Sequence, residues 1–461
     1  MEWWRPPLEA LVGGRKVIVA GGPAVTWSEA VDTLRSVGAT QALVVGTEGM
    51  GVGVPPADAE VVVVEREDHG DDVMAALHAG IRVLDDPPPH VVDAVEAFDP
   101  DRTAVVFGIF LTEAAALAGR PFVAHRRPEW VALEDKTRLA ELLDRAGVAR
   151  SPSMVVPVAA ATSRWRQLDE GAGTVWAADS TAGFHGGAAS TRWVTDDVEA
   201  ATVSAELAQR ATTVRVMPFL DGIPTSIHGI VLPDGVVVLR PVELVTLRRG
   251  RRLVYAGCAT YWDPPTAVRE EMREAARRVG AELRRAVDFR GAFTLDGVAT
   301  RDGFRPTEVN PRFGAGLLTI THGIDVPLTL VMDLVVAGRP LGITAEWLER
   351  ELLEAADAQR NGGTWQIHVP TPEPLGGRGV VYDGVSWRWA LDGEQPDGVG
   401  VSGGGYARLF LARMPVGESV APRAAAFWRF YDEVMGTAIG PLEPAPDVLR
   451  SSDRLPPSTR P

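Results

Sequence analysis

One stretch constrains the fold of this chain more than any other: GAFTLDGVATRDGFRPTEVNPRFGAG, residues 291–316. Two alternating runs flank the sequence TRDG, a pattern that is typical of a β-hairpin with a Gly-containing turn. With the turn centred near Asp302, Asp296 on the first strand falls opposite Glu308 on the second. The sequence therefore predicts a hairpin that brings two carboxylates together.

The second strand of this hairpin carries polar side chains at every second position, Glu308, Asn310 and Arg312. Because successive side chains of a strand alternate, we expect all three on one face. Two carboxylates and a carboxamide suit Mg²⁺, which prefers oxygen ligands, and an arginine beside them can neutralise a phosphate. The glycines of Gly314–Ala315–Gly316 would let backbone N–H groups approach an anion. The alternative is a polar sheet face held by ion pairs.

The N-terminal part of the chain has the pattern of a parallel sheet. Short apolar runs at 16–22, 61–66 and 103–108 alternate with helical spacing and end near glycines, which indicates βαβ units. Residues 1–125 thus look Rossmann-like. The sequence VAGGPAV after the first run is not a GxGxxG fingerprint, so we expect a structural sheet without a dinucleotide.

The rest of the chain mixes helices with antiparallel strands. A helix is expected over 134–152, capped by Asp135 and ended by Gly147. Turn signals break β alternation within 212–252, which predicts an antiparallel sheet. Further expected elements are a strand–loop–strand segment at 174–194, an amphipathic helix at 264–287, strands and one helix in a small C-terminal domain from about 363, and a Pro-rich disordered tail from 443.

Composition limits the function classes. The net charge of −15 argues against general nucleic-acid binding, which needs a basic surface. We find no apolar run of membrane-spanning length and no secretory signal, and the single cysteine, Cys258, fits a reducing cytoplasm. Of 46 basic residues, Lys16 and Lys136 are the two lysines, which makes the position of each informative.

The hairpin and the segments before it resemble the ATP-grasp carboxylate–amine ligases. The likeness covers residues 125–340, and the N-terminal sheet is similar to a pre-ATP-grasp domain. It implies an α/β chain, with an α+β ATP-grasp core of antiparallel sheets and helices between a Rossmann-like parallel sheet and a small C-terminal domain. The implied boundaries are 1–125 for the N-terminal domain, 126–345 for the ATP-grasp domain with a lid at about 151–220 and a metal-binding core at about 221–345, 346–442 for the C-terminal domain, and 443–461 for a disordered tail.

The resemblance also implies roles for the hairpin residues. Asp296, Glu308 and Asn310 would bind two Mg²⁺ ions that hold the triphosphate of ATP. Arg312 would stabilise the transferring phosphoryl group. Lys136, in the segment LEDKTRLAELLDRAGVARSPS, resembles the family's phosphate-contacting lysine, although a lysine at a helix start can also be incidental.

Nucleotide contacts are implied by two further segments. VRVMPFLDG is similar to the family's strand and hinge that hold adenine, and STAGFHGGAAS resembles its glycine-rich phosphate loop. Asp221 could contact the ribose or be an ordinary turn aspartate, and the glycine segment could be a plain loop. The implied nucleotide-binding residues are Met217, Phe219, Leu220, Asp221, Gly186 and Gly187.

One departure from the family concerns a second lysine before the glycine loop. Ala177 or Ala178 stands where that lysine is expected. Either Arg192, His185 or Arg215 replaces the lost charge, or nucleotide binding is altered.

The predicted function is an ATP-dependent ligase that joins a small carboxylate to an amine or peptide through an acyl phosphate. Arg240 could hold the acid and Glu243 the amine, or the two could form a cross-strand pair. Within the family, VLRPVELVTLRRG and GFRPTEVNPRFGAGL are most similar to the pheganomycin-type peptide ligases of actinomycetes, which implies natural-product biosynthesis. The partners of this chain would be small molecules, and a homodimer is compatible with the sequence.

Other functions stay open at this point. An ATP-binding protein without ligase activity would fit the missing lysine. An ATP-grasp carboxylase or kinase would use bicarbonate or a hydroxyl in place of one partner. A dehydrogenase built on the N-terminal sheet is the least supported, because the fingerprint is absent.

Overall fold

The computed structural model describes residues 2–47, 54–65, 80–179, 188, 190–250, 252–367, 369, 375–403 and 405–444. The glycine-rich loop with His185, Gly186 and Gly187 lies outside these residues, as does the tail beyond 444. None of the described helices is both long and apolar enough to cross a bilayer.

The N-terminal residues form the predicted parallel sheet, in the strand order β3-β2-β1-β4. Its central strand has an unbroken run of five buried residues, Val17–Gly21, as expected for a strand covered on both faces. The strands are β1 (Lys16–Pro23), β2 (Gln41–Thr47), β3 (Glu60–Val64) and β4 (Val105–Gly108). The helices are α1 (Arg5–Val12), η1 (Ala24–Trp27), α2 (Ser28–Ser36) and α4 (Pro89–Phe98), followed by the short pair β5 (Ala116–Leu117) and β6 (Arg120–Pro121).

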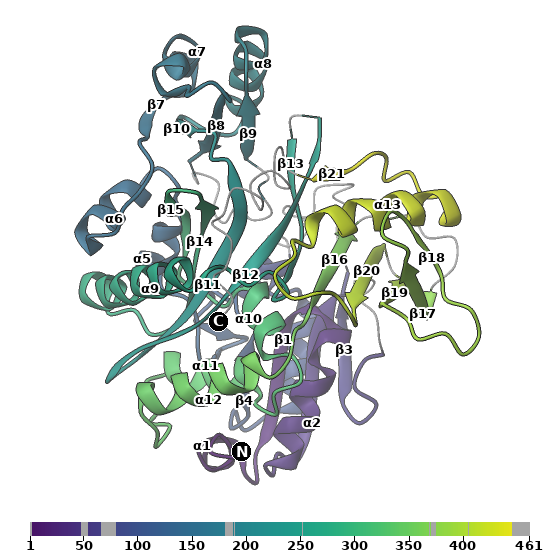
Figure 1. Cartoon of the computed structure of the whole chain (residues 1–461). Helices are drawn as coiled ribbons and strands as arrows, with labels where there is room; N and C mark the ends of the chain where they lie inside the picture. The colour runs from purple at the N-terminus through teal and green to yellow at the C-terminus, as the bar shows by residue number, and fades with distance from the viewer. Residues whose placement is uncertain are drawn as a thin grey trace.

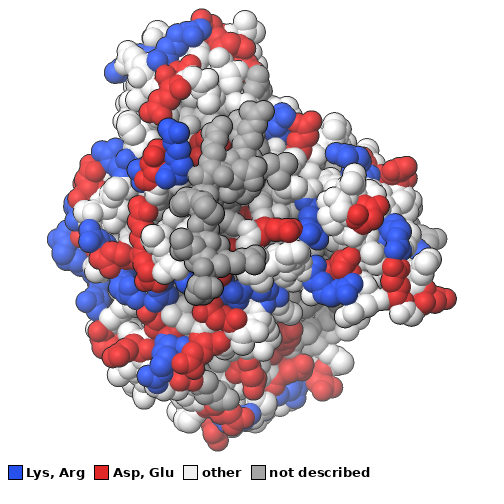
Figure 2. Space-filling view, in the orientation of Figure 1, with Lys and Arg blue, Asp and Glu red and all other residues white. Residues whose placement is uncertain are grey.

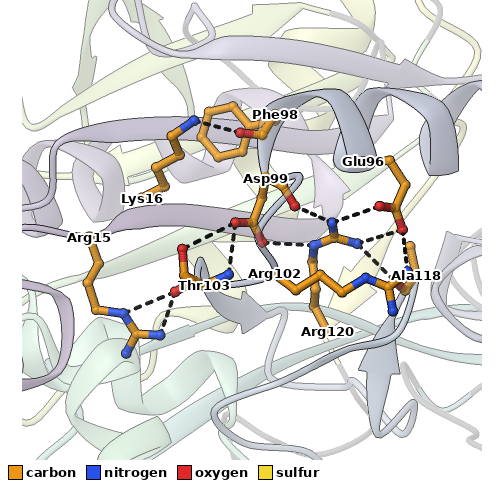
Figure 3. A network of polar contacts seen from close by, with 9 residues as sticks. All are labelled: Arg15, Lys16, Glu96, Phe98, Asp99, Arg102, Thr103, Ala118 and Arg120. Carbon is orange, nitrogen blue, oxygen red and sulfur yellow. Dashed lines mark hydrogen bonds and ion pairs between the residues drawn. The ribbon is translucent and has the colours of Figure 1, made fainter.

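A buried arginine ties these elements together (Figure 3). Arg120 is 1% exposed, and its Nε donates to Asp99 Oδ2 at 2.8 Å. Its two terminal nitrogens donate to Glu96, to the Asp99 carbonyl and to the Ala118 carbonyl. The other Asp99 oxygen accepts from the Thr103 N–H at 2.9 Å. Each polar atom of the arginine is thus hydrogen-bonded, which is how a buried charge is tolerated.

A small antiparallel lobe follows in the chain and stands at the top of Figure 1. Helices α7 and α8 cover its strands around the buried side chains of Trp165 and Trp176. Asp196 caps α8 by accepting from the Glu199 N–H. The elements are β7 (Met154–Pro157), α7 (Val158–Arg164), η3 (Trp165–Leu168), β8 (Thr174–Ala178), β9 (Thr191–Val194), α8 (Asp197–Leu207) and β10 (Thr213–Pro218).

The central sheet has the antiparallel order β15-β14-β11-β12-β13. The long helix α9 packs on one face, and α10, α11 and α12 pack on the other. The strands are β11 (Gly222–Leu232), β12 (Gly235–Arg249), β13 (Arg252–Ala259), β14 (Gly291–Thr300) and β15 (Gly303–Asn310). The helices are α9 (Thr266–Val287), α10 (Ala315–Thr321), α11 (Leu328–Val336) and α12 (Ala345–Asp357).

The C-terminal strands extend this central sheet rather than forming a sheet of their own. β13 pairs with β16, and the order continues β16-β20-β19-β17-β18. Glu443 and Pro444, the first residues of the expected tail, form β21 and pair with β12. The elements are β16 (Gly362–Ile367), β17 (Leu375–Tyr382), β18 (Trp387–Trp389), β19 (Gly398–Gly403), β20 (Tyr406–Leu411) and α13 (Ala421–Met435).

The helix expected over 134–152 is much shorter in the structure. Following α5 (Pro128–Val131) and η2 (Ala132–Glu134), helix α6 spans Leu139–Ala146 and ends at Gly147 with a φ of 65°. Asp135 does not cap this helix, because its carboxylate accepts from the Thr137 N–H and hydroxyl instead. Lys136 therefore lies in a turn before the helix.

Basic and acidic side chains are interspersed on the face of the molecule that Figure 2 shows.

Candidate active site

The predicted register of the β14–β15 hairpin is confirmed. Asp296 pairs with Glu308 and Thr294 with Asn310. The ladder shifts between Asp296 and Gly297, and Thr307 is the extra residue. The neighbouring Pro306 has no N–H to donate, so a bulge at this point removes little hydrogen bonding.

Asp296 is the most perturbed carboxyl of this hairpin. Its Oδ2 accepts from Asn310 Nδ2 at 3.0 Å, whereas its Oδ1 is buried and has no hydrogen-bond partner among the described residues. Burial, and then the charge of Glu308, raise the pKa of Asp296 to about 7. A carboxyl in this state is stabilised by an added cation, because a cation supplies the missing electrostatic partner.

Two cationic side chains flank the carboxylates. Lys136 Nζ lies 2.7 Å from Glu308 Oε1, so the turn before α6 delivers this lysine to the hairpin. Arg312 NH2 donates to Asn310 Oδ1 at 3.3 Å, and Arg312 Nε donates to Glu134 Oε1 at 2.9 Å. The structure therefore brings together the residues predicted for metal and phosphate contacts.

Sequence reasoning missed Glu134 and Arg126. Glu134, at the end of η2, accepts from both Arg312 and Arg126 through the same oxygen, Oε1. Glu134 and Arg126 are each 5% exposed. The sequence HRRPEWVALED showed charges near Lys136, but no pattern indicated that this segment folds against Arg312, 178 positions further along.

The glycines after the hairpin are needed for close packing, whatever the loop binds. A Cβ on Gly316 would lie 2.2 Å from the His228 ring, and a Cβ on Gly314 would lie 2.6 Å from the Thr294 hydroxyl. His228 is buried between Thr294 and Ser226, and burial lowers its pKa to about 3. Close packing against this neutral histidine is a sufficient reason for both glycines, and the approach of an anion to the backbone of this loop stays a prediction.

The residues predicted to hold adenine lie where β10 ends. Met217 is buried opposite Val175 on β8. The Phe219 N–H is already engaged, because it donates to the Gly173 carbonyl at 3.0 Å, and its ring packs on Trp193. Leu220 and Asp221 are half-buried in the connection to β11, so they are the accessible part of this hinge.

Of Arg192 and Arg215, the two predicted replacements for the missing lysine that the structure describes, Arg215 contacts the hairpin. It pairs directly with Ala177, so both side chains leave the same face of the lobe. Its NH2 donates to the Thr307 carbonyl at 2.7 Å, and burial lowers its pKa to about 10. Arg192 instead donates to Glu206 on α8, with Nε 3.0 Å from Oε2.

Arg240 and Glu243 do not join the hairpin residues. Arg240 donates to Asp357 at 2.6 Å and to Asp263 at 3.3 Å. Glu243 accepts from the Ser419 hydroxyl and from the N–H groups of Val420 and Ala421, so it holds the start of α13. The cross-strand pair considered from the sequence is therefore absent, since each residue is held by a different element.

The hairpin presents oxygen atoms of the kind that Mg²⁺ prefers, but few of them. The described residues contain no cluster of three or more His, Cys, Asp or Glu side chains suited to a metal ion. Asp296 and Glu308 supply two carboxylates, and the Asn310 oxygen could turn toward them only if its carboxamide rotated away from Arg312. Two carboxylates with waters and phosphates are the usual protein environment of Mg²⁺.

No protein-family model and no curated protein matches the chain. Solved enzymes are nevertheless similar in fold. The N5-carboxyaminoimidazole synthase of Aspergillus clavatus, solved with ADP and 5-aminoimidazole ribonucleotide, has a TM-score of 0.51 and 13% identity over 87% of this chain and 94% of its own. A second N5-carboxyaminoimidazole ribonucleotide synthetase, solved with ADP, has a TM-score of 0.52 and 12% identity, covering 92% and 98%.

The biotin carboxylase of Campylobacter jejuni, solved as a beta-gamma-ATP complex, has a TM-score of 0.52 and 15% identity, covering 86% of this chain and 87% of that one. These enzymes have the ATP-grasp fold. The parallel N-terminal sheet and the large antiparallel sheet described above match it, so the predicted fold class is confirmed.

Proposed function

We propose that this chain is an ATP-dependent ligase that forms an amide or peptide bond between a carboxylate and an amine. The observation that carries the proposal is the hairpin, where Asp296 keeps a buried oxygen without a hydrogen-bond partner. Glu308 lies opposite Asp296, and Lys136 and Arg312 lie beside them. Such a mixture of hard oxygen ligands and cations suits a metal-bound polyphosphate better than it suits a stable interior.

Some of these residues would bind the metal ion and others would bind the phosphates. Asp296, Glu308 and Asn310 would hold Mg²⁺, which neutralises phosphate charge when bound. Lys136 and Arg312 would donate to phosphate oxygens once nucleotide binding draws them from Glu308 and Asn310. Arg215 would add the charge that Ala177 lacks, since it leaves the same face. The hinge from Met217 to Asp221 would hold the base and ribose.

The reaction begins when a carboxylate oxygen of the acid attacks the γ-phosphorus. The bond between that phosphorus and the β–γ bridging oxygen breaks, and ADP leaves. The amine nitrogen then attacks the acyl carbon, the bond from this carbon to the phosphate oxygen breaks, and the nitrogen loses a proton. Carboxylates are poor electrophiles at neutral pH, so activation by ATP makes the second step accessible.

Similar solved enzymes support the nucleotide part of the proposal. Those of Aspergillus clavatus and Campylobacter jejuni were solved with ADP and as a beta-gamma-ATP complex. The finer proposal, peptide ligation in the biosynthesis of a natural product, rests on the resemblance to pheganomycin-type ligases alone.

The proposal is tested by mass spectrometry of products from ATP, Mg²⁺ and mixed amino acids and peptides, with phosphate release measured in parallel. Amine-dependent phosphate release and a condensed product are expected, and E308Q should abolish both. ATP binding without turnover on any mixture would favour a binding protein instead. Release that depends on bicarbonate rather than on an amine would favour a carboxylase.

A further inference from the structure

A cavity of about 870 Å³ lies between the N-terminal sheet, the connection after the hairpin, α11 and the C-terminal strands. This volume is at the upper end of ordinary ligand pockets and exceeds what a single small amino acid fills. Residues from distant parts of the chain line it, among them Trp27, Arg126, Arg312, Trp365 and Arg408.

Arg126 is the unusual group in this lining. Its side chain is 6% exposed, and its NH2 donates to Glu134. Its Nε and NH1 are buried and make no hydrogen bond within the described residues, although NH1 lies 3.6 Å from a carboxylate oxygen of Glu113. Leaving two buried donors of a charged group without acceptors is costly, so such donors indicate a ligand.

The neighbouring charges favour an anion as that ligand. Glu134 Oε1 is shared between Arg126 and Arg312, and the other acidic neighbour of Arg126, Glu113, is 42% exposed and 3.6 Å from NH1, so the pair of guanidinium groups is incompletely neutralised. Arg312 connects this pair to the proposed phosphate site through Asn310. An anion bound by Arg126 would therefore sit beside the residues that hold the transferring phosphoryl group.

We propose that Arg126 binds the carboxylate of the acid substrate, and that this substrate is a carboxylic acid with an aromatic or otherwise apolar body. The assignment rests on the proposed ligase function and extends it to the acid. The body fits the lining, because Trp27, Trp130, Phe313 and Trp365 all face the cavity. A guanidinium presents two parallel donors, which suits a carboxylate.

Arg408 is the rival anchor. It also lines the cavity and has a buried Nε without a hydrogen bond among the described residues. Its guanidinium, however, lies 4.0 Å from the Phe410 ring centroid and 5.4 Å from that of Trp365. These rings already stabilise its charge, whereas the acidic neighbours of Arg126 are a glutamate that it shares with Arg312 and the more distant, partly exposed Glu113.

The test uses the full chain and two probes of equal shape, 3-phenylpropionate and its neutral amide, 3-phenylpropanamide. Calorimetry should give the wild type at least tenfold tighter binding of the acid than of the amide. R126M should reduce this ratio to about one and R126K should retain part of it, while R127M, a change at the neighbouring half-buried arginine that does not line the cavity, should leave it unchanged. R408M should also leave the ratio unchanged.

A purely structural role for Arg126 would weaken both probes equally, so the ratio separates the two roles even if R126M is less stable. Equal ratios in R126M and wild type, loss of the ratio in R408M alone, or no binding of the acid by the wild type would overturn the assignment. Mg·ATP binding, measured in the same proteins, reports on the ligase proposal separately. A wild type that prefers the acid but ignores Mg·ATP would refute the ligase and keep the anion site.

Discussion

Two buried clusters of charge in this chain have opposite characters. In the N-terminal domain, every polar atom of Arg120 has an acceptor, supplied by Asp99, Glu96 and Ala118. Around the hairpin, buried polar atoms lack hydrogen bonds among the described residues. These atoms are Asp296 Oδ1, Arg126 Nε and NH1, Glu134 Oε2 and Arg215 Nε.

The pKa values follow the same division. Asp99 has a pKa below its ordinary value because hydrogen bonds from Thr103 and Arg120 outweigh the effect of burial. Asp296 has a pKa raised to about 7, because burial and the charge of Glu308 outweigh the Ser226 hydroxyl and the cations nearby. The first cluster is complete as folded, while the second would be completed by ligands. Saturation of hydrogen bonds thus distinguishes the Arg120 cluster from the proposed binding site at the hairpin.

The largest expected effect is on folding. R120M leaves Asp99 buried without its cation, which should lower the free energy of unfolding by about 3–5 kcal/mol. Denaturant unfolding measures this, with R102M, at a 59% exposed position, as control. Activity per folded molecule should be unchanged. A stable R120M protein would show that this cluster is not structural.

D296N, in contrast to R120M, should lower activity without lowering stability. Removing one anionic ligand should reduce Mg·ATP-dependent turnover about 100-fold, a loss typical of a group that acts on developing charge. Stability at neutral pH should be unchanged or higher, because an unfavourable buried charge is removed. D302N, at the exposed turn of the same hairpin, is the matched control. Full activity in D296N would exclude the metal assignment.

Glu243, a third buried carboxyl, extends the comparison to the pH dependence of stability. Burial raises the pKa of Glu243 to about 7, even though it accepts from the start of α13. Its neutral form is favoured in the fold, so the stability it contributes is present below about pH 4.5 and is lost as pH rises through 7. The loss should be on the order of 3 kcal/mol. E243Q, which mimics the neutral form, should flatten this part of the unfolding profile, and an unaltered slope would contradict the assignment.

The smallest effects are expected at the two lysines, Lys16 and Lys136. Lys16 donates to the Phe98 carbonyl at 2.7 Å and lies over the Phe98 ring, so K16M should cost about 1 kcal/mol of stability without a change in turnover. K136M should instead reduce turnover about tenfold, because a charge-assisted contact to phosphate is lost. Steady-state kinetics and thermal melting of both variants decide this. Equal effects of the two changes on turnover would remove Lys136 from the site.

The sequence predicted the hairpin well because its information is local. The turn near Asp302 fixes which residues face each other, and alternation fixes the face. Lys136 was found through the resemblance, but the helix boundary around it was wrong, since Asp135 binds Thr137 instead of capping α6. A short-range side-chain bond of this kind competes with helix formation and does not show in periodicity.

Contacts between distant segments could not be predicted. Glu134 joins Arg126 to Arg312, and Glu243 holds the start of α13, yet neither pairing leaves a spacing pattern. From the sequence, Arg240 was a candidate to hold the acid, as Arg312 was a candidate to contact the phosphoryl group. In the structure, two aspartates accept hydrogen bonds from Arg240. Such roles depend on tertiary packing, which alternation and propensity do not encode.

The shared ladder between β13 and β16 makes the C-terminal segment inseparable from the centre of the protein. Cutting the chain after α12 would uncover the backbone groups along Gly257–Ala259, and naked strand edges of this kind invite aggregation. It would also strip away the wall that carries Trp365. Deletion mapping, a common first step with multidomain enzymes, would thus report on solubility here rather than on catalysis.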